Sequence, residues 1–207
     1  MNLVIFGSTG GIGKHVVEQA LAVGHVVTAV ARRPDAITLR HPCLEVIKGD
    51  VLDPAMVMQA VRGKDAVVSA IGIPKDAETT LYSDGLANIL RAMQAASVRR
   101  VVCVSASGLD PGPLWQKVIA KPLLGAMFKG MYTDLGRMEA IVQRSSLDWT
   151  IMRPPRLSDG THTKIYNVGV NEHLKRCFII SRADVADCIV KNLDNPAHFR
   201  AVVETAY

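Results

Sequence analysis

Residues 7–16 read GSTGGIGKHV and directly follow the short apolar run NLVIF at residues 2–6. Glycine occupies four of the seven positions from 7 to 13. A glycine inside regular structure costs about 0.5–1 kcal/mol relative to alanine, because its unfolded backbone has more freedom to lose. A cluster of this density between a strand and a helix therefore indicates that something requires bare backbone there.

The rest of the chain alternates strand-like and helix-like segments. Short, nearly continuous apolar runs are typical of strands buried on both faces of a parallel sheet, and they occupy residues 2–6, 25–31, 44–48, 65–70, 100–104 and 148–152. Helical patterns fill residues 12–23, 54–62, 78–96 and 132–146, and a last helix runs from Ser181 to about residue 194, with Ser181 and Asp184 at capping-box spacing. This alternation predicts an α/β fold with one doubly wound parallel sheet, a single Rossmann-like domain over residues 1–207 with no linker and no internal repeat.

Composition predicts an ordinary globular domain without a membrane anchor. The 207 residues are 49% hydrophobic and 21% charged, and no apolar stretch reaches the ~20 residues that a membrane span needs. The first residues enter a strand-like run without a basic leader, which predicts a cytoplasmic protein with no stable membrane insertion. The cysteines are dispersed and the histidines show no ligand spacing, so we expect neither disulfides nor a metal site. The four cysteines are Cys43, Cys103, Cys177 and Cys188.

The net charge of +5 comes from basic residues scattered in pairs, and aromatic residues make up only 5% of the chain. Nucleic-acid-binding proteins usually gather their basic side chains into one patch, with aromatic platforms for single strands. We therefore expect no nucleic-acid partner. A smaller anion, such as a phosphorylated cofactor, accounts equally well for a few local arginines.

The glycine-rich loop has the spacing of a phosphate-binding turn. Gly7, Gly10 and Gly13 lie between the first strand and the first helix, where backbone N–H groups and the helix dipole attract a pyrophosphate and a Cβ would block its approach. A tight turn that binds nothing is the alternative. The loop residues taken as cofactor contacts are Gly7, Ser8, Thr9, Gly10, Gly11, Ile12 and Gly13.

The end of the second strand favours NADP(H) over NAD(H). An NAD-binding domain usually places a carboxylate about 20 residues beyond the glycines, but this strand ends in Ala31-Arg32-Arg33-Pro34. A guanidinium can hold a 2′-phosphate with two hydrogen bonds, although both arginines can also be solvated loop residues. Asp50, followed by Val51, suits the adenine edge, or else caps the helix that begins near Pro54.

Several further segments carry a family resemblance. They are KGDVLD at 48–53, VVSAIG at 67–72, VVCVSASG at 101–108, SSLDWTIMRPPRLSDG at 145–160 and IISRADVADCIV at 179–190. With the glycine-rich loop, they resemble the atypical short-chain dehydrogenase/reductases over nearly the whole chain. Within that family, they resemble the NAD(P)H-binding group that holds flavin reductase/biliverdin-IXβ reductase and the NmrA-like proteins.

The resemblance implies roles for residues at the ends of later strands. Ala70, Ile71 and Gly72 become cofactor contacts, and Ser105 becomes the active-site serine, able to bond the substrate or the nicotinamide carboxamide. Pro154, Pro155 and Arg156 are expected along the nicotinamide. A strand-end serine that bonds only backbone is the alternative for Ser105, and Ser107 is a weaker candidate. Arg156 stands where biliverdin-IXβ reductase has histidine, so biliverdin is disfavoured; this arginine holds an anionic acceptor or lies in a solvent-facing loop.

One departure from the larger family bears on the chemistry. Its Tyr-x-x-x-Lys proton-donating pair is absent, because Leu86, Gly136 and Val170 lie four residues beyond Tyr82, Tyr132 and Tyr166, and Tyr207 ends the given sequence. Alcohol oxidation needs a base for the hydroxyl proton, and no obvious base accompanies Ser105 in the sequence. Hydride transfer to FMN, another flavin or a similar conjugated acceptor is less demanding, since the protein mainly orients two rings.

These observations predict an NADPH-dependent reductase that acts on a small-molecule acceptor as a monomer or a small homo-oligomer. The alternative is a non-catalytic NADP(H) redox sensor like the NmrA-like proteins, and a nucleotide-sugar epimerase is disfavoured by the missing pair and the short chain. Substrate-side elements are expected at about 113–131 and 154–180. Residues 114–132, rich in Met and aromatic side chains, form a lid, a membrane-facing or subunit contact, or simply part of the core.

Overall fold

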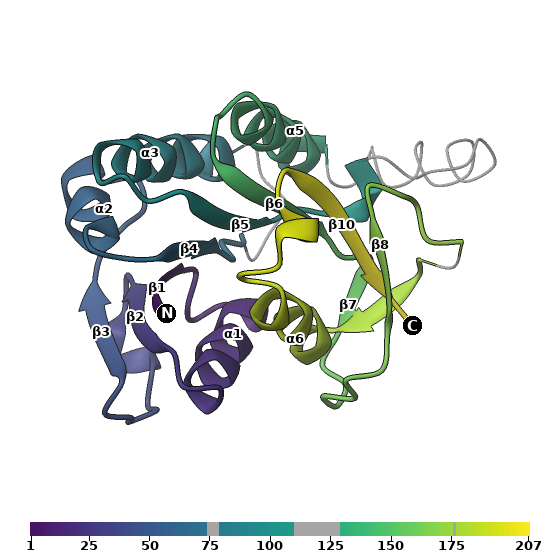
Figure 1. The fold of residues 1–207 in the computed structure, drawn as a ribbon, viewed down its shortest axis with the longest axis horizontal. Helices are drawn as coiled ribbons and strands as arrows, with labels where there is room; N and C mark the ends of the chain where they lie inside the picture. Colours follow the sequence, from purple (N-terminus) through teal and green to yellow (C-terminus); the bar gives the residue numbers. More distant parts are fainter. Residues whose placement is uncertain (74–78, 110–128, 176) are drawn as a thin grey trace.

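The computed structural model describes residues 1–73, 79–109, 129–175 and 177–207 (Figure 1). An eight-stranded sheet runs through the molecule in the order β3-β2-β1-β4-β5-β6-β10-β8, and a two-stranded sheet pairs β7 with β9. The strands are β1 (Asn2–Phe6), β2 (Val26–Ala31), β3 (Leu44–Lys48), β4 (Ala66–Ser69), β5 (Arg100–Val104), β6 (Asp148–Arg153), β7 (Arg156–Ser158), β8 (Asn167–Val170), β9 (Ile179–Ser181) and β10 (Ala201–Ala206). The α-helices are α1 (Gly11–Ala22), α2 (Pro54–Val61), α3 (Leu81–Ala95), α5 (Lys129–Gln143) and α6 (Arg182–Lys191), and short 3₁₀ turns lie at Pro34–Ala36, Ser107–Leu109 and Pro196–His198.

The sheet is covered by helices on both faces. Helices α1 and α6 lie side by side on one face, and α2, α3 and α5 cover the other (Figure 1). Alternate residues of each central strand enter different cores: Leu3 and Ile5 of β1 pack toward α1, while Val4 and Phe6 pack toward α3. Burial on both faces explains the unbroken apolar runs in the sequence. The prediction of a doubly wound, mostly parallel sheet is confirmed.

The later part of the sheet was not predicted. Strand β10 adds to β6 in parallel, and β8 pairs with β10 antiparallel at the edge. Glu204 interrupts the apolar run of β10, yet it is buried because it accepts hydrogen bonds from the His173 Nδ1 and the Leu174 N–H. Strand β8 is short and half exposed at the sheet edge, so its sequence carries little hydrophobic signal.

The helix boundaries largely follow the predicted ones. Helix α5 begins and ends three residues earlier than the predicted 132–146, at Lys129 and Gln143. Ser181 caps α6 as expected, because its Oγ accepts the Asp184 N–H at 3.0 Å. The predicted start of the third helix at residue 78 and most of the expected lid at 114–132 lie outside the described residues.

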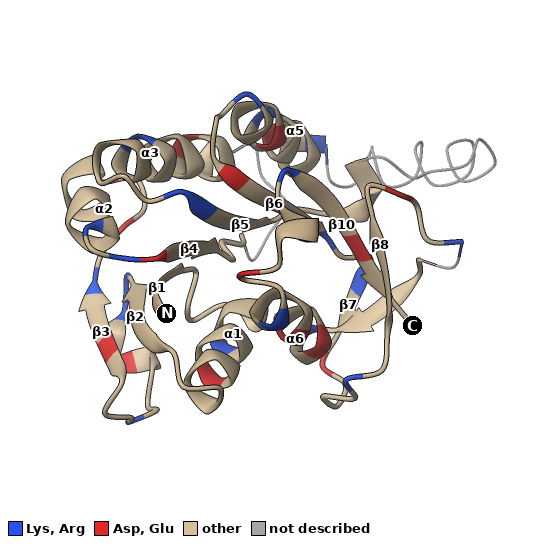
Figure 2. Cartoon of the chain, in the orientation of Figure 1, with Lys and Arg blue, Asp and Glu red and all other residues tan. Residues whose placement is uncertain are grey.

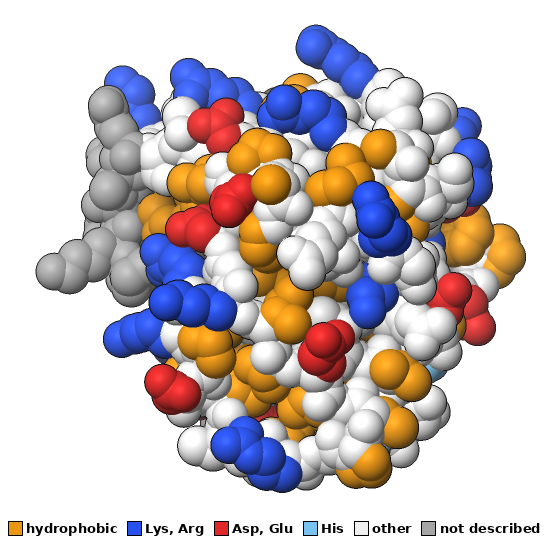
Figure 3. Space-filling model, turned by 90° about the vertical axis from the view of Figure 1, so that its left-hand side faces the viewer, with side chains coloured by type: hydrophobic (Ala, Val, Ile, Leu, Met, Phe, Trp, Pro, Cys, Tyr) orange, Lys and Arg blue, Asp and Glu red, His pale blue; other side chains and the backbone are white. Residues whose placement is uncertain are grey.

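Charged side chains are dispersed over the molecule. Figure 2 shows Lys, Arg, Asp and Glu distributed over helices, strands and loops, and on the face drawn in Figure 3 basic side chains stand among acidic, apolar and neutral ones. Within the described ranges, no helix is both long and apolar enough to cross a membrane. Those same residues include no group of three His, Cys, Asp or Glu side chains that could hold a metal ion.

Candidate cofactor and substrate site

A cleft opens at the carboxyl edge of the sheet, where the connections from β1 and β4 leave in opposite directions. Strands β2 and β3 extend the sheet to one side of β1, and β4, β5 and β6 extend it to the other, so this point is a topological switch, the usual ligand position in such sheets. We call it the carboxyl-edge cleft. It is lined by Phe6, Gly7, Thr9, Gly10, Val30, Ala31, Arg32, Gly49, Asp50, Val51, Ile71, Gly72 and Leu81.

Two glycines of the loop are required by the fold itself. Gly7 has φ +79°, and a Cβ on it would overlap the carbonyl of Ala70. A Cβ on Gly13 would overlap the Gly7 carbonyl oxygen, because α1 packs directly against the end of β1. These contacts explain why the turn is tight and why α1 begins where it does.

Gly10 lines the cleft, as Gly7 does, and it stands at the start of α1. It is the N-cap of α1 with extended backbone (φ −74°, ψ 167°) and no side-chain cap. The Gly10 N–H donates to the Gly7 oxygen at 2.9 Å, and a Cβ on Gly10 would lie 3.1 Å from that oxygen. The first N–H groups of an α-helix lack intrahelical acceptors, so this end of α1 presents donors beside the open cleft.

The other loop residues are placed differently from one another. Thr9 lines the cleft, whereas the Ser8 side chain is turned inward, with Oγ donating to the Val30 oxygen at 2.7 Å. Ile12 is buried in the core of the α1 face. The side chains of Ser8 and Ile12 therefore do not line the cleft.

Gly11 does not line the cleft, and its lack of a side chain has another cause. A Cβ on Gly11 would lie 2.5 Å from Cδ of Arg182. The Arg182 side chain crosses from α6 over the start of α1, and its Nη1 pairs with Asp159 at 2.8 Å. Gly11 thus leaves space for an arginine of the neighbouring helix.

The two arginines after β2 separate in the structure. Arg32 lines the cleft, but Arg33 is not among the lining residues and precedes the 3₁₀ turn at Pro34–Ala36. The cleft brings Arg32 together with Asp50 and Val51 on its far wall. The alternative role of Asp50 as a helix cap is wrong: Asp53 caps α2 by accepting the Ala55 N–H at 2.9 Å, while Asp50 Oδ1 accepts the Leu52 N–H at 3.0 Å.

Of the contacts predicted after β4, some line the cleft and one does not. Ile71 and Gly72 line the cleft, and Ala70 is buried with its carbonyl against Gly7. The sequence reading missed Leu81, which lines the cleft from the first turn of α3. No local pattern in the sequence marks it.

Ser105 lies just beyond the carboxyl end of β5 and is buried. Its N–H donates to the Met152 oxygen at 2.7 Å, and its Oγ donates to Glu139 Oε1 at 2.6 Å. The expectation that no base accompanies Ser105 is therefore wrong, and so is the alternative in which its hydroxyl bonds only backbone. Helix α5 supplies the carboxylate from 34 residues away in the chain.

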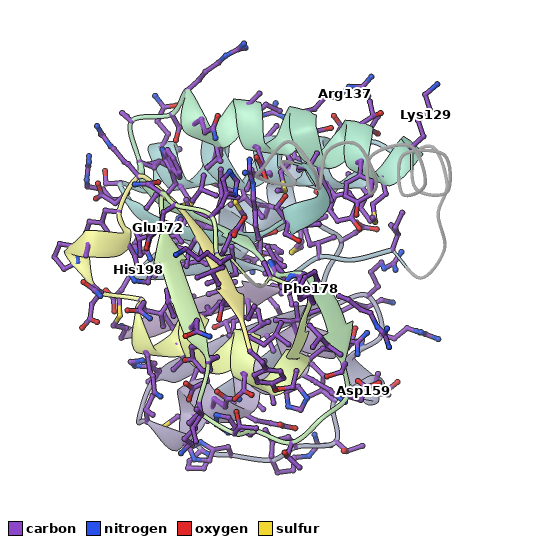
Figure 4. The ribbon with its side chains drawn as sticks, turned by 90° about the vertical axis from the view of Figure 1, so that its right-hand side faces the viewer. Lys129, Arg137, Asp159, Glu172, Phe178 and His198 are labelled. Carbon is purple, nitrogen blue, oxygen red and sulfur yellow. The ribbon has the colours of Figure 1, made fainter. Side chains whose placement is uncertain are left out.

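Arg153 of β6 completes this group. Its Nε donates to Glu139 Oε1 at 2.9 Å and its Nη2 to Glu139 Oε2 at 2.5 Å. Figure 4 shows Lys129 and Arg137 projecting from α5 away from the sheet, whereas Glu139 is 5% exposed on the helix face that also carries Leu135 and Val142. A charged residue inside an apolar helical stripe is the sequence signal that could have revealed it.

The remaining predicted residues follow β6. Pro154 accepts the Ser107 N–H at 3.0 Å, which joins the segment after β6 to the turn after Ser105. Arg156 is exposed at the start of β7, beside Ile179 of β9. Neither Ser105 nor residues 154–156 line the carboxyl-edge cleft, so the structure places them beyond it, along β5 and β6.

Tyr132 lies in the first part of α5, above the turn that contains Gly108. A Cβ on Gly108 would overlap the Tyr132 hydroxyl, and burial raises the pKa of this tyrosine. Gly136 follows Tyr132 by four residues, about one turn further along α5. Cys177 is half-buried, and burial together with Glu204 raises its pKa to about 12, so its thiol stays protonated.

Comparison with known proteins identifies the family of the chain. The family model described as NAD(P)H-binding matches residues 7–196. The chain belongs to this NAD(P)H-binding family. The predicted resemblance to the atypical short-chain dehydrogenase/reductases is thereby confirmed.

The chain is similar to several individual proteins. YwnB of Bacillus subtilis, named as uncharacterized, is 25% identical over 206 residues, which cover 96% of this chain and 94% of YwnB. The photosystem II assembly factor Ycf39 of Trieres chinensis is 30% identical over 157 residues; these cover 74% of this chain but only 45% of that longer protein. Among solved structures, ChuY, an anaerobillin reductase from Escherichia coli O157:H7, has a TM-score of 0.79 and 26% identity, and covers 99% of this chain and 96% of its own.

Proposed function

We propose that this member of the NAD(P)H-binding family is an NADPH-dependent reductase that passes a hydride directly to a flavin or a similar conjugated acceptor. The observation that carries the proposal is the carboxyl-edge cleft. It combines the glycine-rich start of α1 with Arg32 at the end of β2, where an NAD-binding domain usually has a carboxylate. The reductase name of ChuY, a relative that matches nearly the whole chain, supports the same activity class.

The described residues fit NADP(H). Gly7 and Gly10 leave the backbone open at the start of α1, where free N–H donors and the helix dipole stabilise a pyrophosphate. Arg32 would hold the 2′-phosphate, and Asp50 with Val51 would face the adenine. When bound, NADPH supplies the hydride, and the chain holds and orients it.

The surroundings of Ser105 support hydride transfer to a conjugated ring rather than reduction of an isolated carbonyl, which needs a proton donor. Its hydroxyl proton is already donated to Glu139, and Tyr132 has Gly136 instead of a lysine one turn later. Neither residue forms the proton-donating pair of the larger family. A conjugated ring system can take up hydride first and a proton from water later, so the protein needs no strong acid at this position.

Positions beyond the cleft would complete the site. Ser105, Pro154, Pro155 and Arg156 would lie along the nicotinamide, and Arg156, exposed at the start of β7, would attract an anionic acceptor. Most of the expected lid at 114–132 lies outside the described residues. The four free cysteines support a reducing compartment, which for this proposal is the cytoplasm.

The same geometry favours one second candidate, a non-catalytic sensor of the NADP redox state. A site that binds NADP(H) without a free proton donor at Ser105 can report coenzyme state to a partner protein. Turnover separates the two. NADPH oxidation would be followed with FMN, riboflavin and quinones, beside a calorimetric titration of NADPH.

NADPH consumption that depends on one of these acceptors would support the reductase. Tight binding of NADPH without turnover would instead support the sensor. Absence of binding to NADPH and NADH alike would overturn both.

A further inference from the structure

Three elements converge on one buried group of side chains beyond the carboxyl-edge cleft. Ser105 follows β5, Glu139 comes from α5 and Arg153 ends β6. The Glu139 and Arg153 side chains are 6% and 12% exposed, and Ser105 is 7% exposed. A buried ion pair of this kind rarely stabilises a fold more than well-packed apolar side chains would. We therefore ask what the pair does for Ser105, which it contacts, rather than for stability.

The hydrogen bonds within the group determine where the serine proton lies. Glu139 Oε1 accepts from Ser105 Oγ at 2.6 Å and from Arg153 Nε at 2.9 Å, and Oε2 accepts from Arg153 Nη2 at 2.5 Å. A guanidinium only donates, so the paired carboxylate only accepts. Ser105 has a single hydroxyl proton, and it is committed to Glu139. Toward a ligand, Ser105 Oγ offers only its lone pairs, so it can act only as a hydrogen-bond acceptor.

The segments that carry this acceptor and part of the cleft lining leave two neighbouring parallel strands. Ser69 at the end of β4 is paired with Cys103 of β5, and Ile71 and Ser105 each follow this pair by two residues. Ile71 lines the cleft. A ligand that continues from the cleft along the carboxyl edge would meet Ser105 next.

We propose that Glu139 and Arg153 are positioning residues that make Ser105 an obligate hydrogen-bond acceptor for the carboxamide N–H of a bound nicotinamide. The inference rests on the proposed coenzyme. The carboxamide is the substituent of the nicotinamide ring that carries N–H donors, and it matches an acceptor that cannot donate. The bond orients the ring, and Ser105 transfers no proton.

Glu139→Gln tests the polarity directly. A neutral amide at this position can donate to Ser105, which would free the serine proton to turn toward the ligand and would end its preference for a donor. Ser105→Ala removes the acceptor while leaving the Glu139–Arg153 pair intact, and it is informative even if Glu139→Gln folds poorly.

The measurement compares two coenzymes by calorimetry. One is NADP⁺, and the other is its 3-acetylpyridine analogue, in which a methyl group replaces the carboxamide NH₂. The wild-type protein should bind NADP⁺ about two- to twelve-fold more tightly than the analogue, the range expected for one net hydrogen bond. In Ser105→Ala and Glu139→Gln this ratio should fall to about one.

Asp134→Asn is the matched control. Asp134 is also a buried carboxylate on α5, and it accepts hydrogen bonds from the Ser83 hydroxyl and from the Tyr82 N–H at the start of α3. Its replacement disturbs α5 and α3 without touching Ser105. The affinity ratio between the two coenzymes should therefore keep its wild-type value, even if the melting temperature falls.

The outcomes separate the inference from the proposed function. If NADP⁺ binds and the wild-type ratio is already about one, or if Glu139→Gln keeps the wild-type ratio, the positioning role is wrong while NADP(H) binding stands. If neither coenzyme binds the wild-type protein, the proposed function fails and the inference fails with it.

Discussion

Replacement of Arg32 by alanine is the sharpest test of coenzyme choice, because the structure separates it from its neighbour. Arg32 lines the carboxyl-edge cleft, and Arg33 does not. If Arg32 holds the 2′-phosphate, its loss removes a hydrogen bond to a charged group, worth roughly 1.5–3 kcal/mol. Since about 1.4 kcal/mol is tenfold in affinity, NADPH binding should weaken by about 10- to 150-fold.

The matched variant Arg33→Ala removes the same charge one residue further along the chain. It should weaken NADPH binding far less, because only screened, long-range attraction is lost. Affinity for NADH, which lacks the 2′-phosphate, should hardly change in either variant. Calorimetric titration of both variants with NADPH, NADH and 2′-AMP measures all of these differences, and 2′-AMP isolates the phosphate contact from the rest of the coenzyme.

Two results would refute this reasoning. If the wild-type protein prefers NADH, the argument from the missing carboxylate after β2 is wrong. If Arg33→Ala costs as much as Arg32→Ala, the arginines act through overall charge, and the specific contact at the cleft is wrong.

Four other substitutions test the glycine-rich loop, the serine and the acidic residue in the first turn of α6. Gly10→Val should abolish NADPH binding in a folded protein, because the side chain would enter the phosphate position. Circular dichroism checks that the variant is folded and calorimetry measures its NADPH affinity; an unchanged affinity would contradict the prediction. Gly13→Ala should instead lower the melting temperature, since its Cβ would overlap the Gly7 oxygen. Ser105→Ala should slow turnover only about tenfold, near 1.4 kcal/mol, with a shallow pH profile, whereas a loss of 10²–10⁴ would indicate an obligatory acid. Burial opposes ionisation of Asp184, but hydrogen bonds outweigh it and lower the pKa below the ordinary 3.8; they come from Tyr207, Lys164, Thr163 and Ser181. The stability that the ionised carboxylate contributes is therefore complete above pH 3.8 and is lost as the pH falls through the lowered pKa. Urea unfolding of Asp184→Asn should show a smaller drop in stability through that acidic window than the wild type shows.

Much of the fold could be predicted because its signals are local. Apolar runs such as residues 2–6 and 100–104 are continuous, since alternate side chains enter cores on opposite faces of the sheet. Strands β8 and β10 could not be predicted in that way. Their burial depends on long-range partners such as His173, whose contact with Glu204 joins residues 31 positions apart.

The sequence by itself identified several residues that line the carboxyl-edge cleft. Gly7, Gly10 and Gly13 are close in the chain, and the turn that they form needs only the strand before it and the helix after it. Arg32 was identified for the same reason, because it directly follows a buried strand whose end must reach the carboxyl edge of the sheet.

Only the tertiary structure decided the state of Ser105. Its hydroxyl proton belongs to Glu139, and that carboxylate is fixed by Arg153, 14 residues further along the chain. The packing of α5 across the ends of β5 and β6 brings the three side chains together, and no sequence spacing encodes that distance. Whether a hydroxyl acts as donor or acceptor depends on which partner lies within about 3 Å of it. For Ser105, the tertiary packing determines that partner.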